Sequence, residues 1–300
     1  MRDDPTPAVS VVVPTYNRDC ALAGCLDALA RQSVDPRRFE VVVIDDGSTD
    51  GTTDVCRQQA PRFARFTTHR QANRGPAAAR NAGIRMARAP LVAFTDDDCV
   101  PPPDWLHRIL DRFASEPDLG GLGGLMITPP HQWVPLTHHS DLTAPGTSDY
   151  SRFIGTNNAA YRRDILLQVG GFDEAFRHVS VEDAELYIRI RRVAHTAIDP
   201  DLYVSHPPRL MGFGEAIRGY VRFYEGYAAL EERYPDDFRD LYGSTAAGAV
   251  LGGRSWRTRA RLYLPGMVRH PWRGVQFIAY LVCSRLAVMA RAIRRRRTAR

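Results

Sequence analysis

The chain has 300 residues, of which 44% are hydrophobic and 25% charged, and it carries a net charge of +6. This length suits one large domain or one domain with an appendage, with enough apolar residues for a sizeable core. The five cysteines are odd in number and include no CxxC pair, which argues against a disulfide framework or a zinc site. Residues 1–8 are polar and show no apolar segment of a secretory signal, so we expect a cytoplasmic location.

Strand and helix patterns alternate along the first two thirds of the chain. We predict strands at 9–13, 39–44, 63–67, 91–95, 119–128 and 156–161, short extended segments at 197–198 and 202–206, and helices at 21–30, 76–83, 103–113, 163–169 and 181–190. This alternation predicts an α/β fold with a mostly parallel sheet flanked by helices. The loop 129–150 is long enough to suggest a functional or mobile segment.

The character of the sequence changes after Pro207-Pro208, so we expect a domain at 8–207 and a helical, Arg-rich C-terminal region at 208–300. Residues 241–300 hold thirteen arginines and no acidic residue, whereas residues 1–240 carry a net charge of −7. Such a tail typically meets an anionic surface, either acidic lipid or nucleic acid, although it can also serve only solubility. No nucleic-acid recognition motif accompanies the arginines, so we expect no nucleic-acid partner.

We predict further helices at 213–232 and 275–293, and consider a third at 244–264. The helix at 275–293 is apolar, but Gln276, Arg285 and Arg291 interrupt it, which disfavours a membrane-spanning helix. Arg294–Arg297 follow it, as in an interfacial helix that binds an anionic membrane surface. A helix that packs on the domain is the alternative.

Polar and acidic residues follow three of the predicted strands. They are Thr15-Tyr16-Asn17, Asp45-Asp46-Gly47-Ser48 and Asp96-Asp97-Asp98. Ligands of open α/β sheets bind beyond the carboxyl ends of the strands, so we expect these segments to meet. A divalent cation would relieve the repulsion among the three carboxylates, although a solvated acidic turn is the alternative. Asp96 and Asp98 would share one side of an extended chain, with Asp97 a spacer turned away.

Six motifs in a fixed order resemble the family 2 glycosyltransferases of GT-A fold. They are Val13–Arg18, Asp45–Thr52, Asn73–Gly83, Asp96–Asp98, Gly170–Glu174 and Glu182-Asp183. The resemblance spans Val9 to about His206 and does not cover the C-terminal region. It implies a GT-A type, Rossmann-like sheet and an inverting transfer of a sugar from a nucleotide-diphosphate donor, UDP-sugar favoured, to an acceptor hydroxyl. Such reactions serve cell-envelope, polysaccharide or glycolipid synthesis.

The resemblance also implies where the donor binds. Thr15, Tyr16 and Asp46 would hold the base, Arg80 would lie near the nucleotide, and Asp96 would contact the ribose. Asp98 and His206 would bind Mn²⁺ or Mg²⁺, which would bridge the diphosphate and neutralise charge on the leaving group. A lone histidine before two prolines can equally be structural.

The family's general base corresponds to Asp183, whose first-turn position on a helix would lower the pKa of its carboxyl. Neighbouring Glu182 and burial would raise that pKa, so we expect proton transfer late in the attack. Ordinary helix-start charge is the alternative for both residues. Asn157 and Asn158 lie where the family often contacts donor or acceptor, but a turn-forming or capping pair fits as well.

Two other functions share parts of this pattern. A sugar nucleotidyltransferase would have a similar site but usually a glycine-rich phosphate loop near the first strand, and that loop is missing. A non-catalytic nucleotide-sugar-binding protein of the same fold is disfavoured by the intact Asp96, Asp98 and Asp183.

Overall fold

The computed structural model describes residues 6–127, 153–176, 181–206, 212–246, 249 and 271–298, together with two short strands at 143–144 and 147–148. Within 271–298, side chains are described at 275, 279 and 282–294. The chain divides into two compact units, one of Met1–Ile127 with Phe153–His206 and one of Thr128–Arg152 with Pro207–Arg300. The domain limits expected from the sequence, 8–207 and 208–300, stay a prediction.

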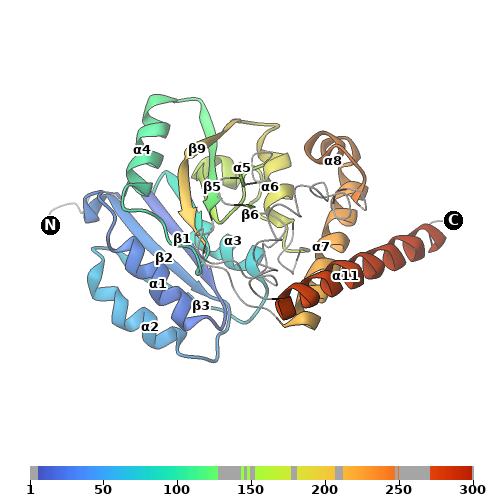
Figure 1. Cartoon of the computed structure of the whole chain (residues 1–300). Helices are drawn as coiled ribbons and strands as arrows, with labels where there is room; N and C mark the ends of the chain where they lie inside the picture. Colours follow the sequence, from blue (N-terminus) through green and yellow to red (C-terminus); the bar gives the residue numbers. More distant parts are fainter. Residues whose placement is uncertain are drawn as a thin grey trace. The chain divides into compact units, whose positions relative to one another are not determined.

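A seven-stranded sheet forms the centre of the first unit (Figure 1). In spatial order its strands are β3 (Phe66–Arg70), β2 (Phe39–Asp45), β1 (Val9–Thr15), β4 (Leu91–Thr95), β8 (Asn158–Arg162), β5 (Leu119–Ile127) and β9 (His195–Ser205). Only β8 runs antiparallel to its neighbours, β4 and β5, among the described strands of this sheet. The predicted α/β fold with a mostly parallel sheet is therefore confirmed.

The central strands are apolar along almost their whole length because helices cover both faces of the sheet. In β1, Val9, Val11, Val12 and Val13 are fully buried, and β2 is buried at every position. β-Branched residues favour this pleated, enclosed geometry. The polar residues at the strand ends are therefore the first side chains that such a strand can offer to a ligand.

Six helices lie in the described part of this unit: α1 (Asp19–Leu29), α2 (Thr52–Gln59), α3 (Pro76–Met86), α4 (Trp105–Ser115), α5 (Arg163–Gln168) and α6 (Glu182–Ile190). Single 3₁₀ turns occupy Pro36–Arg38 and Ala60–Arg62. Figure 1 shows α1 and α2 side by side near β1–β3. α3 packs closely on β1, since a Cβ on Gly83 would come within 2.2 Å of Val12 Cγ1. One core cluster joins Phe94 and Tyr161 of the sheet to buried side chains of α3, α5 and α6.

Two predicted strands differ from the structure. The third strand begins at Phe66 rather than at 63, because Phe63 ends the 3₁₀ turn and stacks on Phe66 with ring centroids 5.2 Å apart. The segments 197–198 and 202–206 belong to the single strand β9, which shifts register between Gly124 and Leu125 of β5. A Cβ on Gly124 would lie 2.1 Å from the Leu202 carbonyl oxygen, so the glycine permits this close approach.

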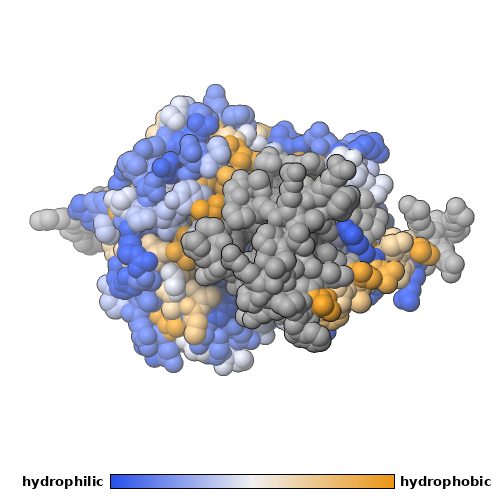
Figure 2. Space-filling view, viewed as in Figure 1, coloured by the Kyte–Doolittle hydropathy of each residue, from blue (hydrophilic) through white to orange (hydrophobic). Residues whose placement is uncertain are grey.

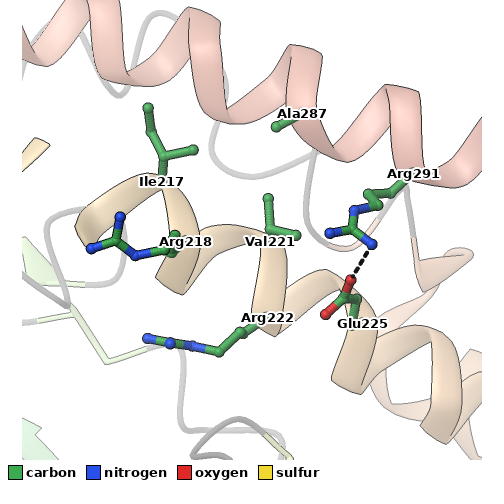
Figure 3. A pocket seen from close by; sticks show the side chains of 7 residues that line it. All are labelled: Ile217, Arg218, Val221, Arg222, Glu225, Ala287 and Arg291. Carbon is green, nitrogen blue, oxygen red and sulfur yellow. Dashed lines mark ion pairs between the residues drawn. The ribbon is translucent and has the colours of Figure 1, made fainter. Parts of the chain in front are cut away.

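The second unit contains α7 (Phe213–Arg233), α8 (Pro235–Tyr242) and α11 (Pro271–Thr298), with the short strands β6 (Thr143–Ala144) and β7 (Thr147–Ser148). α7 and α11 pack on each other, and Glu225 and Arg291 form an ion pair of 3.0 Å between them (Figure 3). Ile217, Val221 and Ala287 line the cavity beside this pair. The predicted helix at 244–264 and the histidines of the loop 129–150 fall largely or wholly outside the described residues.

Candidate active site

The strand ends meet at one edge of the sheet. Thr15 at the end of β1 pairs in register with Asp45 of β2, and the Asp46 amide donates to the Thr15 carbonyl at 2.9 Å. Thr95 at the end of β4 lies opposite Asn158 at the start of β8. β9 ends at the same edge, which brings His206 to the segment that follows β4. Residues from distant parts of the sequence thus surround one region, as the strand-end argument predicts.

Asp46 anchors the loop that leads into α3. Its buried carboxylate accepts from Gln71 Nε2 at 2.7 Å, from the Arg74 amide at 3.0 Å and from the Gly75 amide at 2.8 Å. Gly75 has φ of +90°, a conformation that strongly favours glycine. The Arg74 amide also reaches the other carboxylate oxygen at 3.2 Å, so a ligand N–H would share the Asp46 carboxylate with these donors. The Tyr16 side chain, 47% exposed, follows β1 at the same edge.

Asp97, expected to be only a spacer turned away from the ribose and the metal, is buried and has polar partners of its own. Its side chain is only 4% exposed and accepts from the Thr15 hydroxyl at 2.7 Å and from Arg18 Nη1 at 3.0 Å. The chain turns directly after β4, where the Cys99 amide donates to the Asp96 carbonyl at 3.1 Å, so the alternation of an extended strand does not apply. Burial raises the pKa of Asp97 to about 6, even though Arg18 opposes the shift.

Asp98 and His206 form the centre of a candidate metal site. Asp98 Oδ1 lies 3.2 Å from His206 Nε2, and Asp98 Oδ2 lies 2.5 Å from Arg18 Nη1. Burial by itself would lower the pKa of His206, but the hydrogen bond and the charge of Asp98 raise it overall. Cys99 Sγ belongs to the same group, whose potential ligand atoms lie within 4.8 Å of one another.

The donor set of this group suits a hard or borderline divalent cation. A carboxylate oxygen and an imidazole nitrogen, already side by side, are ligands that Mn²⁺ accepts, and an oxygen ligand also suits Mg²⁺. Burial raises the pKa of the Cys99 thiol well above its ordinary value, so the thiol stays protonated and binds such ions poorly. Asp98 and His206 therefore suit Mn²⁺ or Mg²⁺ as ligands, and Cys99 contributes little to such a site.

Arg80 links the end of β4 to the start of α6. Its side chain is 4% exposed, with Nη2 donating to Asp96 Oδ1 at 2.8 Å and Nη1 donating to Glu182 Oε1 at 2.9 Å. The guanidinium also lies 5.7 Å from the centroid of the Phe172 ring. Among the described residues its Nε has no hydrogen-bond partner. Arg80 is thus held by two carboxylates within the protein.

Asp183 lies in the first turn of α6, partly exposed, and accepts from the Ala184 amide at 2.8 Å. Burial raises the pKa of Asp183 to about 7, and the charge of Glu182 acts in the same direction. Arg80 and the Ala184 amide oppose the shift but do not outweigh it. A carboxyl with a pKa near neutrality can take up a proton at physiological pH, which is the property a general base needs.

Hydrogen bonds that the sequence does not predict fix the turn before α6 and tie α6 to that turn. Asn81 on α3 exchanges two hydrogen bonds with the backbone of Phe172, at 2.8 and 2.9 Å. A Cβ on Gly171, which has φ of +71°, would lie 2.4 Å from Asn81 Oδ1. Arg189 on α6 donates to the carbonyls of Val169 and Gly171 and pairs with Glu185. Asn81 and Gly171 belong to the recognised motifs, but nothing in the sequence shows that they touch.

The asparagine pair is buried among the strands. Asn158 is fully buried, accepts from Trp105 Nε1 at 2.8 Å, and donates to the carbonyls of Leu125 at 2.9 Å and Leu202 at 3.1 Å. Asn157 is mostly buried, with Nδ2 at 3.2 Å from Met126 Sδ. The Asn158 side chain therefore ties β8 to α4, β5 and β9.

Curated proteins resemble the chain over much of its length. A validoxylamine A glucosyltransferase of Streptomyces hygroscopicus subsp. limoneus is 34% identical over 218 residues, which cover 61% of this chain and 48% of that protein. The glycosyltransferase AglE of Haloferax volcanii is 28% identical over 226 residues, 73% of each chain. The chain spans about half the length of the first of these relatives.

Solved structures share the fold. The mannosyltransferase PcManGT of Pyrobaculum calidifontis, in complex with GDP-Man and Mn²⁺, has a TM-score of 0.65 at 23% identity, covering 95% of this chain and 88% of that one. TarS of S. aureus, residues 1–349 with UDP-GlcNAc, has a TM-score of 0.57 at 18% identity, covering 94% and 91%. The model of the family named glycosyl transferase family 2 matches residues 10–169, which is more than half of the chain. The chain therefore belongs to glycosyl transferase family 2.

Proposed function

We propose that this protein is an inverting, metal-dependent glycosyltransferase that moves a sugar from a nucleotide-diphosphate donor to an acceptor hydroxyl. The observation that carries the proposal is the linkage of two groups by Arg80. Arg80 pairs with Asp96, which lies next to the candidate metal site, and with Glu182, which lies next to the proposed base Asp183. A donor-binding group and a proton acceptor thus lie on either side of one buried arginine.

The donor's nucleotide binds over the ends of β1 and β2 in this proposal. Tyr16 offers an exposed ring for stacking on the base, and Asp46 offers a carboxylate for a base N–H. The Thr15 hydroxyl already donates to Asp97, so its part is to shape the floor of the site. Asp96 contacts the ribose and Arg80 orients Asp96. UDP-sugars are the favoured donors, and two neighbours in fold were solved with GDP-Man and with UDP-GlcNAc.

Asp98 and His206 hold Mn²⁺ or Mg²⁺ in this proposal. A divalent cation at this place supplies positive charge to the diphosphate, which makes the nucleotide a better leaving group. Asp98 Oδ1 and His206 Nε2 are already close enough to act together.

Asp183 takes the proton of the acceptor hydroxyl as that oxygen attacks the anomeric carbon. A single displacement from the face opposite the leaving group inverts the configuration at that carbon. With a pKa of about 7, about half of the Asp183 carboxyl groups are ionised at neutral pH, and the ionised form is basic enough to take a proton in the transition state. Glu182, held by Arg80, keeps that basicity high without itself receiving the proton.

The acceptor belongs to cell-envelope, polysaccharide or glycolipid synthesis in this proposal, and the protein works at the cytoplasmic face of the membrane. The support comes from α11, where five exposed apolar residues recur at helical spacing: Val275, Val282, Leu286, Met289 and Ile293. Figure 2 shows hydrophobic surface along this helix. No helix in the described part of the chain is long and apolar enough to cross a bilayer. Peripheral attachment would use this exposed apolar face of α11 together with its arginines.

A panel of UDP-, GDP- and dTDP-sugars, assayed for sugar transfer or hydrolysis with Mn²⁺ and with EDTA, tests this function. We expect release of the nucleoside diphosphate with at least one donor, only in the presence of the cation. Pyrophosphate-dependent formation of a nucleoside triphosphate would instead indicate a sugar nucleotidyltransferase. Donor binding without any turnover, across a range of acceptor sugars and lipids, would indicate a non-catalytic nucleotide-sugar-binding protein.

A further inference from the structure

The carboxylates of the candidate metal site already carry a cationic partner from the protein. Arg18 lies in the loop between β1 and α1, directly before the helix. Its Nη1 atom is 3.0 Å from Asp97 Oδ1 and 2.5 Å from Asp98 Oδ2. The Arg18 carbonyl accepts from the Leu22 amide at 2.9 Å, which fixes the backbone from which the side chain extends.

Each of the three carboxylates after β4 is already paired with an arginine of the protein. Asp96 pairs with Arg80, and Arg18 serves both Asp97 and Asp98. Asp97 needs such a partner because an ionised carboxylate that is almost fully buried is costly. Arg18 differs from Arg80 in one respect, since 34% of its side chain is exposed whereas that of Arg80 is nearly buried. Solvent and ligands can therefore reach the Arg18 side chain more readily than that of Arg80.

We propose that Arg18 is an internal counter-ion that competes with the divalent cation for Asp98 and makes cation binding depend on the nucleotide. The inference rests on the proposed metal site at Asp98 and His206. A guanidinium hydrogen-bonded to a carboxylate repels a second cation on that carboxylate, so the metal binds weakly by itself. The diphosphate of the donor brings negative charge that attracts both cations, which relieves the competition. Cation and donor consequently bind with positive coupling.

Mn²⁺ titrations of the full-length protein, followed by the electron paramagnetic resonance signal of free Mn²⁺, test this role without any turnover. We expect Arg18→Met to bind Mn²⁺ at least about tenfold more tightly than wild type in the absence of nucleotide. Added UDP should tighten Mn²⁺ binding strongly in wild type and much less in Arg18→Met. Arg18→Lys, which keeps the charge, should stay close to wild type. Arg31→Met removes an exposed arginine that pairs with Asp27 on α1, and should change nothing.

The results separate this inference from the proposed function. If the wild type binds Mn²⁺ and Arg18→Met binds it equally or more weakly, the role of Arg18 is overturned but the metal site is not. Absence of Mn²⁺ binding in every variant overturns both the metal site and the inference. If Arg18→Met does not fold, the double variant Arg18→Met/Asp97→Asn removes the guanidinium together with its buried partner. Asp97→Asn alone then serves as its reference, and tighter Mn²⁺ binding by the double variant is again the expected result.

Discussion

Asp183 and Arg80 show how burial gives neighbouring charged side chains different tasks. Burial and Glu182 raise the pKa of Asp183 to about 7, which suits a proton acceptor. Arg80 is surrounded by carboxylates that favour its charged form, so it remains a fixed cation. Asp183, which titrates near neutrality, thus lies close to Arg80, which stays charged. Asp183 can transfer a proton, whereas Arg80 can only position its partners.

Replacing Asp183 by asparagine removes the proposed base while preserving the size of the side chain. We expect turnover in the donor assay to fall by about 10²–10⁴-fold, the usual contribution of a positioned base, with the thermal unfolding temperature little changed. Asp164→Asn, at an exposed carboxylate in the first turn of α5, should keep full activity. Near-normal turnover by a folded Asp183→Asn variant would remove this residue as the base.

The pH dependence of kcat/KM reports the charge around Asp183. The base acts only when deprotonated, so activity should fall as the pH drops through about 7. Glu182→Gln removes a negative charge that raises the pKa of Asp183, so the acidic limb of the profile should move to lower pH. Glu116→Gln serves as the control, because it makes the same change directly after α4, away from α6 in the sequence. An acidic limb that stays in place or moves upward in Glu182→Gln would contradict this electrostatic account.

Residue types and motif order are enough to suggest a role for most of the candidate site residues. They do not predict which side chains pair with these residues. The sequence predicts three carboxylates after β4, yet it cannot show that Asp97 turns inward to Thr15 and Arg18. That direction depends on a turn directly after the strand and on Arg18, which belongs to a segment about 80 residues earlier. Arg18 lies within a recognised motif, but its place beside Asp98 is a tertiary contact that no local pattern encodes.

At the scale of helices and strands, Asn158 links elements around the irregular side of the sheet. Its amide contacts α4, β5 and β9 from the first residue of β8. The break in register between β5 and β9 lies at the same place, where Gly124 allows the Leu202 carbonyl to approach. The buried amide thus satisfies two strand carbonyls near the point where the ladder is interrupted.

Asn158→Ala should destabilise the fold. The indole N–H of Trp105 and two buried carbonyls would lose their partner, so we expect the free energy of unfolding to fall by about 2–4 kcal/mol. Chemical denaturation measures this loss. The neighbouring Asn157→Ala, which gives up a single contact with Met126 Sδ, should cost less than about 1.5 kcal/mol. A stable Asn158→Ala variant whose only defect is a higher KM for the donor would instead support a substrate contact.

Elements dominated by local pattern were well predicted, and those set by tertiary contacts were not. Sequence alone is enough to recognise the apolar runs of β1, β2 and β4 and the alanine-rich start of α3. The limits of β3 depend on the packing of Phe63 on Phe66, and the unity of β9 depends on its pairing with β5 across the register shift. Both features arise between segments, so single-segment propensities cannot supply them.

At the scale of the whole molecule, the residues proposed for catalysis and those proposed for membrane attachment lie in different regions of the sequence. The resemblance to the family extends to about residue 206, and the arginines gather after residue 240. α11 combines an exposed apolar face with Arg291 and Arg294, the composition of an interfacial helix. The sequence predicts this helix, but only the structure shows that its apolar residues form an exposed face.

Binding to lipid vesicles tests the proposed attachment. We expect the full-length protein to sediment with vesicles containing phosphatidylglycerol, and much less with pure phosphatidylcholine, because the arginines favour an anionic surface. Leu286→Gln/Ile293→Gln should weaken binding by at least about tenfold, since it removes two apolar side chains from the face. Leu167→Gln/Val193→Gln changes side chains of similar exposure in the first unit and should have no effect. Equal binding by the two double variants would refute the attachment.

The central claim is that the carboxyl edge of the sheet is a nucleotide-diphosphate site assisted by a divalent cation at Asp98 and His206. Isothermal titration calorimetry of UDP, GDP and dTDP, with and without Mn²⁺, tests it most directly. The account predicts that at least one nucleotide binds tightly with Mn²⁺, binds at least about tenfold more weakly without it, and loses the benefit of Mn²⁺ in Asp98→Asn. Nucleotide binding that is the same with and without Mn²⁺, or equally enhanced by Mn²⁺ in Asp98→Asn, would contradict it.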